Sequence, residues 1–266
     1  FGPQGSELSE LSTPLDDPAR WSLARTIQRA ENQFVGVACG LLDMFTSLFG
    51  QQGRAVTLDC ATFEHGRVPL GPPTPAIVVC DSRTERRLAE GMYNLRRGEC
   101  ERVVAWFQAH DREQGRNHPR AWLRDVSLEE LATHWDALDP VGRRRARHVL
   151  NENQRVTRAR AALEQGDLAE FGRLMSASHD SSREDFENSS PALDGLIDQA
   201  RSAPGFLGGK LSGAGWAGCT VNLVETDQAT AFAQQVQTAH ERAFGVRPEV
   251  HLCRPAPGAL GWPDSK

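Results

Sequence analysis

A glycine-rich stretch between two strand-like runs constrains this chain more than any other feature of its sequence. Within Lys210–Cys219, the residues Gly213, Gly215 and Gly218 have the spacing G-x-G-x-x-G, and apolar residues lie on both sides. Glycines at this density allow positive φ angles and let the backbone approach a ligand closely. Successive amide N–H groups in such a loop can bind an anion. The stretch therefore predicts either a tight glycine turn between two strands or a loop that lies against phosphate groups.

The residues that follow this stretch exclude one common interpretation of its spacing. A dinucleotide-binding fingerprint requires a helix directly after the glycines and an acidic residue about 20 positions further on. Here the strand-like run Thr220–Val224 follows instead. The chain also contains no G-x-x-x-x-G-K-S/T phosphate loop. A glycine loop of another kind is therefore expected.

The charge and cysteine content exclude several classes of protein. The 266 residues carry a net charge of −5, which gives no sign of a nucleic-acid surface. No apolar run approaches the length of a membrane span, and the N-terminus has no secretory pattern. The six cysteines are scattered, without C-x-x-C pairs or zinc-like spacing to histidines. We expect reduced thiols in a cytoplasmic protein.

Helices and short strands are mixed in this sequence without regular alternation, which predicts an α+β fold. Asp17-Pro18 favours a helix start, and this first helix should end at Glu31. A second helix is expected over 41–49, and a long third one over about 84–110. Further helices are expected after Ser127, from 143, over 168–178, over 192–203 and over 227–244. Strands are expected over 55–60, 67–70, 76–80 and 248–253.

Two side chains on these helices have both a structural and a functional interpretation. Asp43, in the first turn of the second helix, either complements the helix dipole or is a catalytic carboxylate. Tyr93, on the long helix, is either a core or rim residue or a ligand contact. The basic run Arg143–Arg147 has no interleaved aromatic residue, so we interpret it as a solvated helix face.

Six segments, taken in order, resemble motifs of the galactokinases, which are GHMP small-molecule kinases. The resemblance extends from about Trp21 to Gly258, and six ordered matches make it specific. The segments are 30–43 (AENQFVGVACGLLD), 93–100 (YNLRRGEC), 144–148 (RRARH) with Glu152, Asn153 and Arg155, 172–179 (GRLMSASH), 190–194 (SPALD) and 212–219 (SGAGWAGC).

The resemblance implies a role for each candidate residue. It implies that Asp43 is the catalytic carboxylate that faces the anomeric hydroxyl of galactose. It implies that Glu31 is the acidic ligand of Mg²⁺ and that Tyr93 contacts the sugar. The loop residues that it places near the phosphates of ATP are Gly213, Ala214 and Gly215.

The resemblance also implies an architecture and an activity. Residues 1–50 would be the remainder of an N-terminal, ribosomal S5 domain 2-like domain. Residues 51–266 would be a complete C-terminal, ferredoxin-like GHMP domain that carries the glycine loop. The implied activity is the ATP-dependent phosphorylation of galactose to galactose 1-phosphate, the first committed step of galactose metabolism. We expect a cytoplasmic monomer as the full-length protein, without nucleic-acid or membrane partners.

The sequence departs from the family pattern in several places. It lacks the sugar-recognition segment and the P-x-x-x-GLSSSA phosphate loop, which would lie upstream of Phe1, so we expect little activity from these 266 residues alone. Met44 replaces the usual Gln beside Asp43. Ala217 replaces a Gly, which requires a negative φ at that position.

These departures leave two alternatives open. The chain could be a non-catalytic GHMP scaffold that binds a sugar or a partner protein. It could also be a kinase of a related sugar, such as N-acetylgalactosamine or arabinose.

Overall fold

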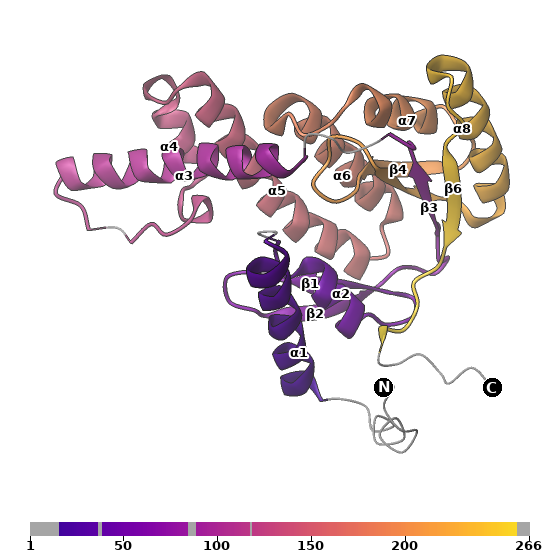
Figure 1. Ribbon diagram of the computed structural model, residues 1–266, viewed down its shortest axis with the longest axis horizontal. Helices are drawn as coiled ribbons and strands as arrows, with labels where there is room; N and C mark the ends of the chain where they lie inside the picture. Colours follow the sequence, from indigo (N-terminus) through magenta and orange to yellow (C-terminus); the bar gives the residue numbers. More distant parts are fainter. Residues whose placement is uncertain (1–15, 37–38, 85–88, 118, 260–266) are drawn as a thin grey trace. The chain divides into compact units, whose positions relative to one another are not determined.

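The computed structural model describes residues 16–36, 39–84, 89–117 and 119–259, which form parts of two compact units (Figure 1). Unit 1 comprises Phe1–Leu70 and Arg254–Lys266, and unit 2 comprises Gly71–Cys253. The hairpin at 54–69 falls within unit 1. The predicted domain division between residues 50 and 51 stays a prediction. Each unit is described by itself.

In the described residues of unit 1 there are two α-helices and a two-stranded antiparallel sheet. A π-helical turn, Glu31–Val35, follows the first helix directly. The glycines at 36 and 40 predict a turn between this segment and the next helix, but residues 37 and 38 lie outside the described residues. In the sheet, Ala55 pairs with Val68 and Thr57 with Gly66. The elements are α1 (Asp17–Ala30), α2 (Leu42–Phe49), β1 (Arg54–Leu58) and β2 (His65–Pro69).

Local sequence signals account for the ends of α1. Its cap is Asp16, one residue earlier than predicted, and the Asp16 carboxylate accepts a hydrogen bond from the Ala19 amide at 2.9 Å. Pro18 lies in the first turn, where its missing N–H leaves no helical hydrogen bond unmade. The helical winding does not stop at Glu31 but widens into the π-helical turn, which ends at Gly36 with φ +84°.

Aromatic rings form the core of unit 1. The Trp21 ring of α1 lies 5.3 Å from the Phe45 ring and 5.3 Å from the Phe49 ring of α2. His65, on β2, contacts Phe49 edge-on at 5.0 Å. This cluster fixes α2 against α1 and the hairpin, so the first turn of α2 stands on a packed base.

Unit 2 is built on a four-stranded antiparallel sheet in the order β4-β5-β3-β6. Strand β5 is the most strongly buried of the four. In its neighbour β3, Val78 pairs with Asn222 on one side and Leu252 on the other. The outer strand β4 and its neighbour β5 form a hairpin that contains the glycine stretch. The strands are β3 (Ala76–Asp81), β4 (Phe206–Leu211), β5 (Cys219–Val224) and β6 (Glu249–Cys253).

Six α-helices of unit 2 fall within the described ranges (Figure 1). The helix predicted from Ser127 to Asp139 is shorter than expected, because it ends at Thr133 and a 3-10 turn follows at Trp135–Ala137. The next helix begins at Pro140, before the predicted start at 143. A second π-helical turn, Ser182–Phe186, follows α6. The α-helices are α3 (Ala89–Glu113), α4 (Leu128–Thr133), α5 (Pro140–Glu164), α6 (Leu168–Ser181), α7 (Pro191–Arg201) and α8 (Ala229–Phe244).

Two hydrophobic clusters hold these helices. One joins the sheet to α7 and α8 through residues such as Val78, Leu196 and Phe232. The other joins α3, α4 and α5 through Phe107 and Leu150, among others. The combination of packed helices with an antiparallel sheet confirms the predicted α+β class. Across the described residues, no helix is both long and apolar enough to cross a membrane.

Helix α6 approaches β4 closely enough to require glycine on both sides. A Cβ atom on Gly208 would lie 2.4 Å from the Cα of Gly172, and one on Gly172 would lie 2.0 Å from the carbonyl oxygen of Leu207. This close approach fixes the base of the β4–β5 hairpin against the helical layer.

Candidate active site

The glycine stretch forms the connection between β4 and β5, over residues 212–218. The Ser212 amide donates to the Cys219 carbonyl at 2.9 Å, which closes the base of the loop. Gly213, Gly215 and Gly218 have φ angles of +72°, +89° and +93°. Ser212, Gly213 and Ala214 are exposed. The predicted turn between two strands is confirmed, and residues 212–214 form its exposed side.

A single residue, Asn188, supports the loop from behind. Its carbonyl oxygen accepts a hydrogen bond from the Trp216 amide at 2.7 Å. Its side-chain amide donates to the Ala214 carbonyl at 3.0 Å. A Cβ atom on Gly215 would lie 1.8 Å from the Asn188 carbonyl oxygen, so only glycine fits there. Asn188 therefore fixes both flanks of Gly215.

The backbone at Ala217 has a positive φ, contrary to the negative φ expected from the sequence. A methyl group there was expected to require a negative φ, but φ is +101° and the residue is 1% exposed. A residue other than glycine is sterically strained at a positive φ, at a cost on the order of 1–3 kcal/mol. The hairpin geometry imposes this angle, because Trp216 and Gly218 on either side also have positive φ.

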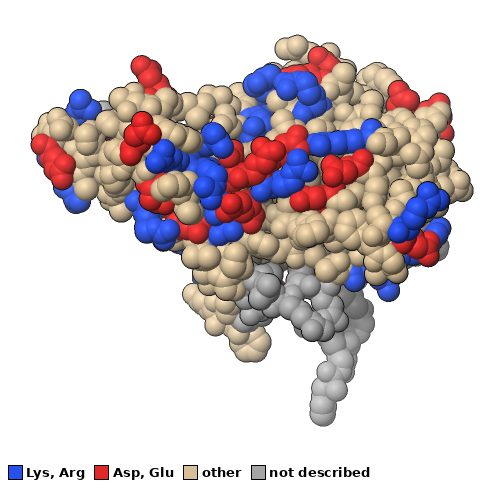
Figure 2. All heavy atoms as spheres, turned by 90° about the horizontal axis from the view of Figure 1, so that it is seen from above, with Lys and Arg blue, Asp and Glu red and all other residues tan. Residues whose placement is uncertain are grey.

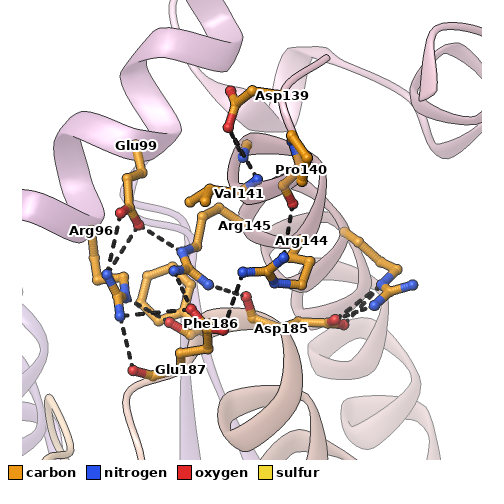
Figure 3. Close-up of polar contacts among 12 residues, drawn as sticks. Arg96, Glu99, Asp139, Pro140, Val141, Arg144, Arg145, Asp185, Phe186 and Glu187 are labelled. Carbon is orange, nitrogen blue, oxygen red and sulfur yellow. Dashed lines mark hydrogen bonds and ion pairs between the residues drawn. The ribbon is translucent and has the colours of Figure 1, made fainter. Parts of the chain in front are cut away.

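Arg145 lies at the centre of a buried ionic network beneath this support (Figure 3). Its side chain is 2% exposed and donates to Glu99 at 2.6 Å and to Glu187 at 2.5 Å. A third bond, at 2.6 Å, goes to the Asp185 carbonyl. Burial opposes the charged form of Arg145, but the hydrogen bonds to both carboxylates outweigh it and raise its pKa. The same contact with Arg145 lowers the pKa of Glu187.

Arg96 joins this network to the loop. Its guanidinium donates to the Phe186 carbonyl at 2.7 Å and to the Glu187 carbonyl at 3.1 Å. It also forms an ion pair with Glu99 at 3.1 Å. The centre of the guanidinium lies 5.7 Å from the centroid of the Trp216 ring, within cation–π range. Helix α3 therefore contacts the loop through Arg96.

The basic run at 143–147 is not the solvated helix face that the sequence suggested, because Arg145 is buried. Each arginine in the run has an acidic partner: Arg143 pairs with Asp136, Arg144 with Glu187, Arg145 with Glu99 and Glu187, and Arg147 with Asp185. Figure 2 shows basic side chains lying beside acidic ones across the visible face. The run is a set of structural ion pairs.

His148 follows this run and is also buried. Its Nδ1 atom lies 2.9 Å from the Ser181 hydroxyl, and its ring stacks on the Phe186 ring at 4.5 Å. Burial lowers the pKa of His148 from 6.5 to about 4. The imidazole is therefore neutral near pH 7, where it packs against the π-helical turn that leads to Asn188.

Tyr93 lies on α3 one helical turn before Arg96, in the same unit as the glycine loop. Its side chain is 42% exposed, which excludes the core interpretation. A rim residue and a ligand contact both fit this exposure. The role of Tyr93 as a sugar contact stays a prediction.

Glu31 and Asp43 both lie in unit 1. Asp43 is exposed in the first turn of α2, and Glu31 is half-buried at the start of the π-helical turn after α1. Within the described residues, neither carboxylate has a hydrogen-bonded or ionic partner. Met44, beside Asp43, packs against the aromatic core of this unit, so the position that usually carries Gln holds an apolar contact here.

Among the described residues, no group of three or more His, Cys, Asp or Glu side chains could hold a metal ion by itself. Mg²⁺ usually takes one or two protein carboxylates and completes its shell with water and phosphate oxygens. A single carboxylate such as Glu31 satisfies that requirement without a dedicated cage.

Two of the segments that resemble galactokinase motifs contain members of the ionic network, but their local sequence predicts no role for these residues. Glu99 and Arg96 lie in the YNLRRGEC segment, and Arg145 lies in RRARH. A buried role for Arg145 could be suspected from its charge next to Ala146 on a helix. Asn188 had no local signal, because its partners lie 26 and 28 residues further along the chain.

Comparison with known proteins agrees with the fold and with these segments. Residues 159–242 match the family model described as GHMP kinases C terminal. The chain is 44% identical to a galactokinase of Roseiflexus sp. (strain RS-1) over 236 residues, which is 89% of this chain and 59% of that protein. It is 39% identical to a human galactokinase over 236 residues, 89% of this chain and 56% of that protein.

A solved structure extends the agreement to three dimensions. The crystal structure of Lactococcus lactis galactokinase complexed with galactose superposes with a TM-score of 0.83 at 32% identity. That match covers 90% of this chain and 60% of the other chain. The chain thus spans a little over half the length of the curated relatives that it matches. Over the length that these comparisons cover, the chain belongs to the GHMP kinases and is homologous to galactokinases.

Proposed function

We propose that this protein contributes to a galactose kinase, which transfers the γ-phosphoryl group of ATP to the anomeric hydroxyl of galactose. The oxygen–phosphorus bond to ADP breaks, a new bond forms to the sugar oxygen, and the hydroxyl proton leaves. The observation that carries the proposal is the superposition on a galactose-bound galactokinase over 90% of the chain. Identities of 39–44% to galactokinases support it.

Asp43 is the group that we assign to the sugar hydroxyl. Phosphoryl transfer depends mainly on alignment of the reacting groups and neutralisation of charge. An exposed carboxylate at the start of a packed helix suits that task, because the aromatic core beneath α2 fixes its position. Asp43 would accept the hydrogen bond of the hydroxyl and take its proton late in the transfer.

The other candidate residues have roles in binding ATP, the sugar and the metal ion. The loop residues Gly213, Ala214 and Gly215, of which the first two are exposed, would lie near the phosphates of ATP. Tyr93, exposed on α3, would contact the sugar. Glu31 would hold Mg²⁺, which supplies charge neutralisation to the phosphate oxygens when bound.

A phosphotransfer assay on the protein expressed from its native gene tests the proposal. ATP consumption is followed with galactose, and then with N-acetylgalactosamine or arabinose in its place. We expect galactose-dependent turnover, and we expect Asp43→Asn to reduce kcat by about 10²–10⁴-fold. Glu64→Gln, which removes an exposed carboxylate from the β1–β2 turn, serves as the matched control and should keep the parental rate. Turnover of only another sugar, or an active Asp43→Asn variant, would contradict the assignment.

The cellular setting is part of the same proposal. In the described part of the chain, which holds all six cysteines, none of them forms a disulfide, as expected in a reducing compartment such as the cytoplasm. We further propose that the functional protein is a monomer, which sedimentation of the native gene product measures directly. A concentration-independent mass of one chain is the expected result.

A further inference from the structure

The ionic network formed by Arg96, Glu99, Arg145 and Glu187 is joined to the glycine loop in two ways, through Asn188 and through the contact of Arg96 with the Trp216 ring. We call these four residues the arginine network (Figure 3). Glu99 is 6% exposed, Arg96 7% and Arg145 2%. None of them touches the exposed side of the loop directly.

The arginine network holds three consecutive backbone carbonyls. Arg145 donates to the carbonyl of Asp185, and Arg96 donates to those of Phe186 and Glu187. Glu187 itself has a left-handed backbone, with φ +55°. A chain segment in this conformation persists only when its surroundings fix it. The two arginines therefore determine where the chain arrives at Asn188.

Glu99 determines where the two arginines lie. It accepts hydrogen bonds from Arg145 at 2.6 Å and from Arg96 at 3.1 Å. Both arginines also pair with Glu187, but the side chain of Glu187 is 44% exposed, so Glu99 is the buried carboxylate of the two. Buried charges rearrange only with difficulty, because any displacement leaves a charge without its partner in a poorly solvated site. Glu99 on α3 is thus coupled to Asn188 through two guanidinium groups.

The coupling then reaches the loop by two routes. Asn188 binds the Trp216 amide and the Ala214 carbonyl, on either side of Gly215. Arg96 lies against the Trp216 ring. Both routes meet at Trp216, which directly follows Gly215.

We propose that Glu99 and Arg145 are positioning residues that set the conformation of the glycine loop through Asn188, and so set the affinity of the site for a nucleoside triphosphate rather than for the sugar. The nucleotide part rests on the proposed function. The conformational part rests on the hydrogen bonds alone.

Hydrogen exchange of the native gene product without ligand tests the conformational part. Glu99→Gln keeps the shape of the side chain and removes its charge, and we expect the Trp216 amide to exchange at least about tenfold faster. Glu101→Gln is the matched control, because Glu101 lies two residues away on α3 in an exposed pair with Arg97. It should leave loop exchange unchanged, and amides of α8 should be unchanged in both variants.

Two results would overturn the conformational part. One is an unchanged Trp216 amide in folded Glu99→Gln. The other is equal acceleration in the loop and in α8, which would make the arginine network a general stabiliser of the unit.

A second variant keeps the test decisive if Glu99→Gln fails to fold. Arg144→Gln removes a partially exposed guanidinium that donates to Glu187 at 3.1 Å, so a milder acceleration of about two- to fivefold is expected. No acceleration in Arg144→Gln would also refute the coupling. Where Glu99→Gln folds, the double variant with Asn188→Ala should increase the rate of amide exchange in the loop by less than the product of the two single increases. The reason is that both substitutions act through the contacts of Asn188. Effects that multiply fully would contradict that route.

Steady-state kinetics separate this inference from the proposed function. In the galactose assay, Glu99→Gln should raise KM for ATP about tenfold and leave KM for galactose within twofold. A rise in both constants alike would overturn the nucleotide part. If the parent protein itself shows no turnover with galactose, the proposed function fails, while the exchange measurements still decide the positioning role.

Discussion

The carbonyl oxygen of Asn188 lies 1.8 Å from the place that a Cβ atom on Gly215 would occupy. The same oxygen accepts the Trp216 amide at 2.7 Å, so it cannot move away without breaking that hydrogen bond. The glycine in the middle of the loop is therefore required by a residue that precedes it by 27 positions. The loop is not an independent turn, because its shape depends on a segment that α3 and α5 hold in place.

Gly215→Ala tests this relationship through stability. The added methyl would meet the carbonyl and also require φ +89°, so we expect the free energy of unfolding to fall by about 3 kcal/mol or more. Gly166→Ala is the control, since Gly166 has φ +72° but nothing within 4 Å of the added atom. It should cost about 1 kcal/mol, from the backbone angle alone. Urea titration of both variants measures the difference, and equal costs would contradict the close contact.

Ala217→Gly should not lower the free energy of unfolding, although most substitutions that remove a buried methyl group do. Relief of the positive φ contributes on the order of 1–3 kcal/mol, which offsets the greater flexibility of glycine in the unfolded chain, about 0.5–1 kcal/mol. We expect between no loss and a gain of about 1 kcal/mol in stability. Ala146→Gly deletes the same methyl from a buried position in α5 and should cost about 2 kcal/mol. Thermal melts that show similar losses for both would rule out strain at residue 217.

His148 should make stability depend on pH below neutrality. Its folded-state pKa is about 4, below the ordinary 6.5, so the unfolded chain binds the proton first. This contribution is complete above pH 6.5 and is lost as the pH falls toward 4. Between pH 7 and pH 5 the loss amounts to about 2 kcal/mol.

His148→Gln should remove that part of the pH dependence. Denaturant titrations at pH 7 and pH 5 compare it with the parent and with His251→Gln, which changes an exposed histidine on β6. Burial also lowers the pKa of His179 and His240, so a residual slope of the same sign is expected in every variant. An unchanged slope in His148→Gln would contradict the assignment.

Arg120 should be worth more to stability than an exposed arginine of the same unit. It is 6% exposed and contacts Asp111 and Glu130, each at 2.5 Å. The contact with Arg120 lowers the pKa of Glu130 to about 2. Arg120→Met should cost about 3–5 kcal/mol, because two carboxylates lose one buried guanidinium. Arg97→Met breaks an exposed pair and should cost less than about 1 kcal/mol, as measured by urea titration.

Local chemistry in the sequence predicted most of the secondary structure. Ser190-Pro191 begins α7, because it supplies a capping side chain followed by a ring that already has a helical φ. Asp139-Pro140 begins α5 in the same way, three residues before the predicted start at 143. The Ser127–Glu130 capping box begins α4 for similar reasons. These signals act over a few residues, so they can be recognised without knowledge of the tertiary structure. The short 3-10 and π-helical turns were not predicted, since they depend on how the helices pack.

The sequence by itself determined that three glycines would join two strands and that six segments would follow the order found in galactokinases. Only the tertiary structure decided that Arg145 is buried, that Ala217 has φ +101° and that Asn188 supports the loop. The reason is distance along the chain: Arg145 meets Glu99 across 46 residues and Glu187 across 42. Periodicity and capping describe neighbours, whereas burial of a charge depends on partners that only the folded chain brings together.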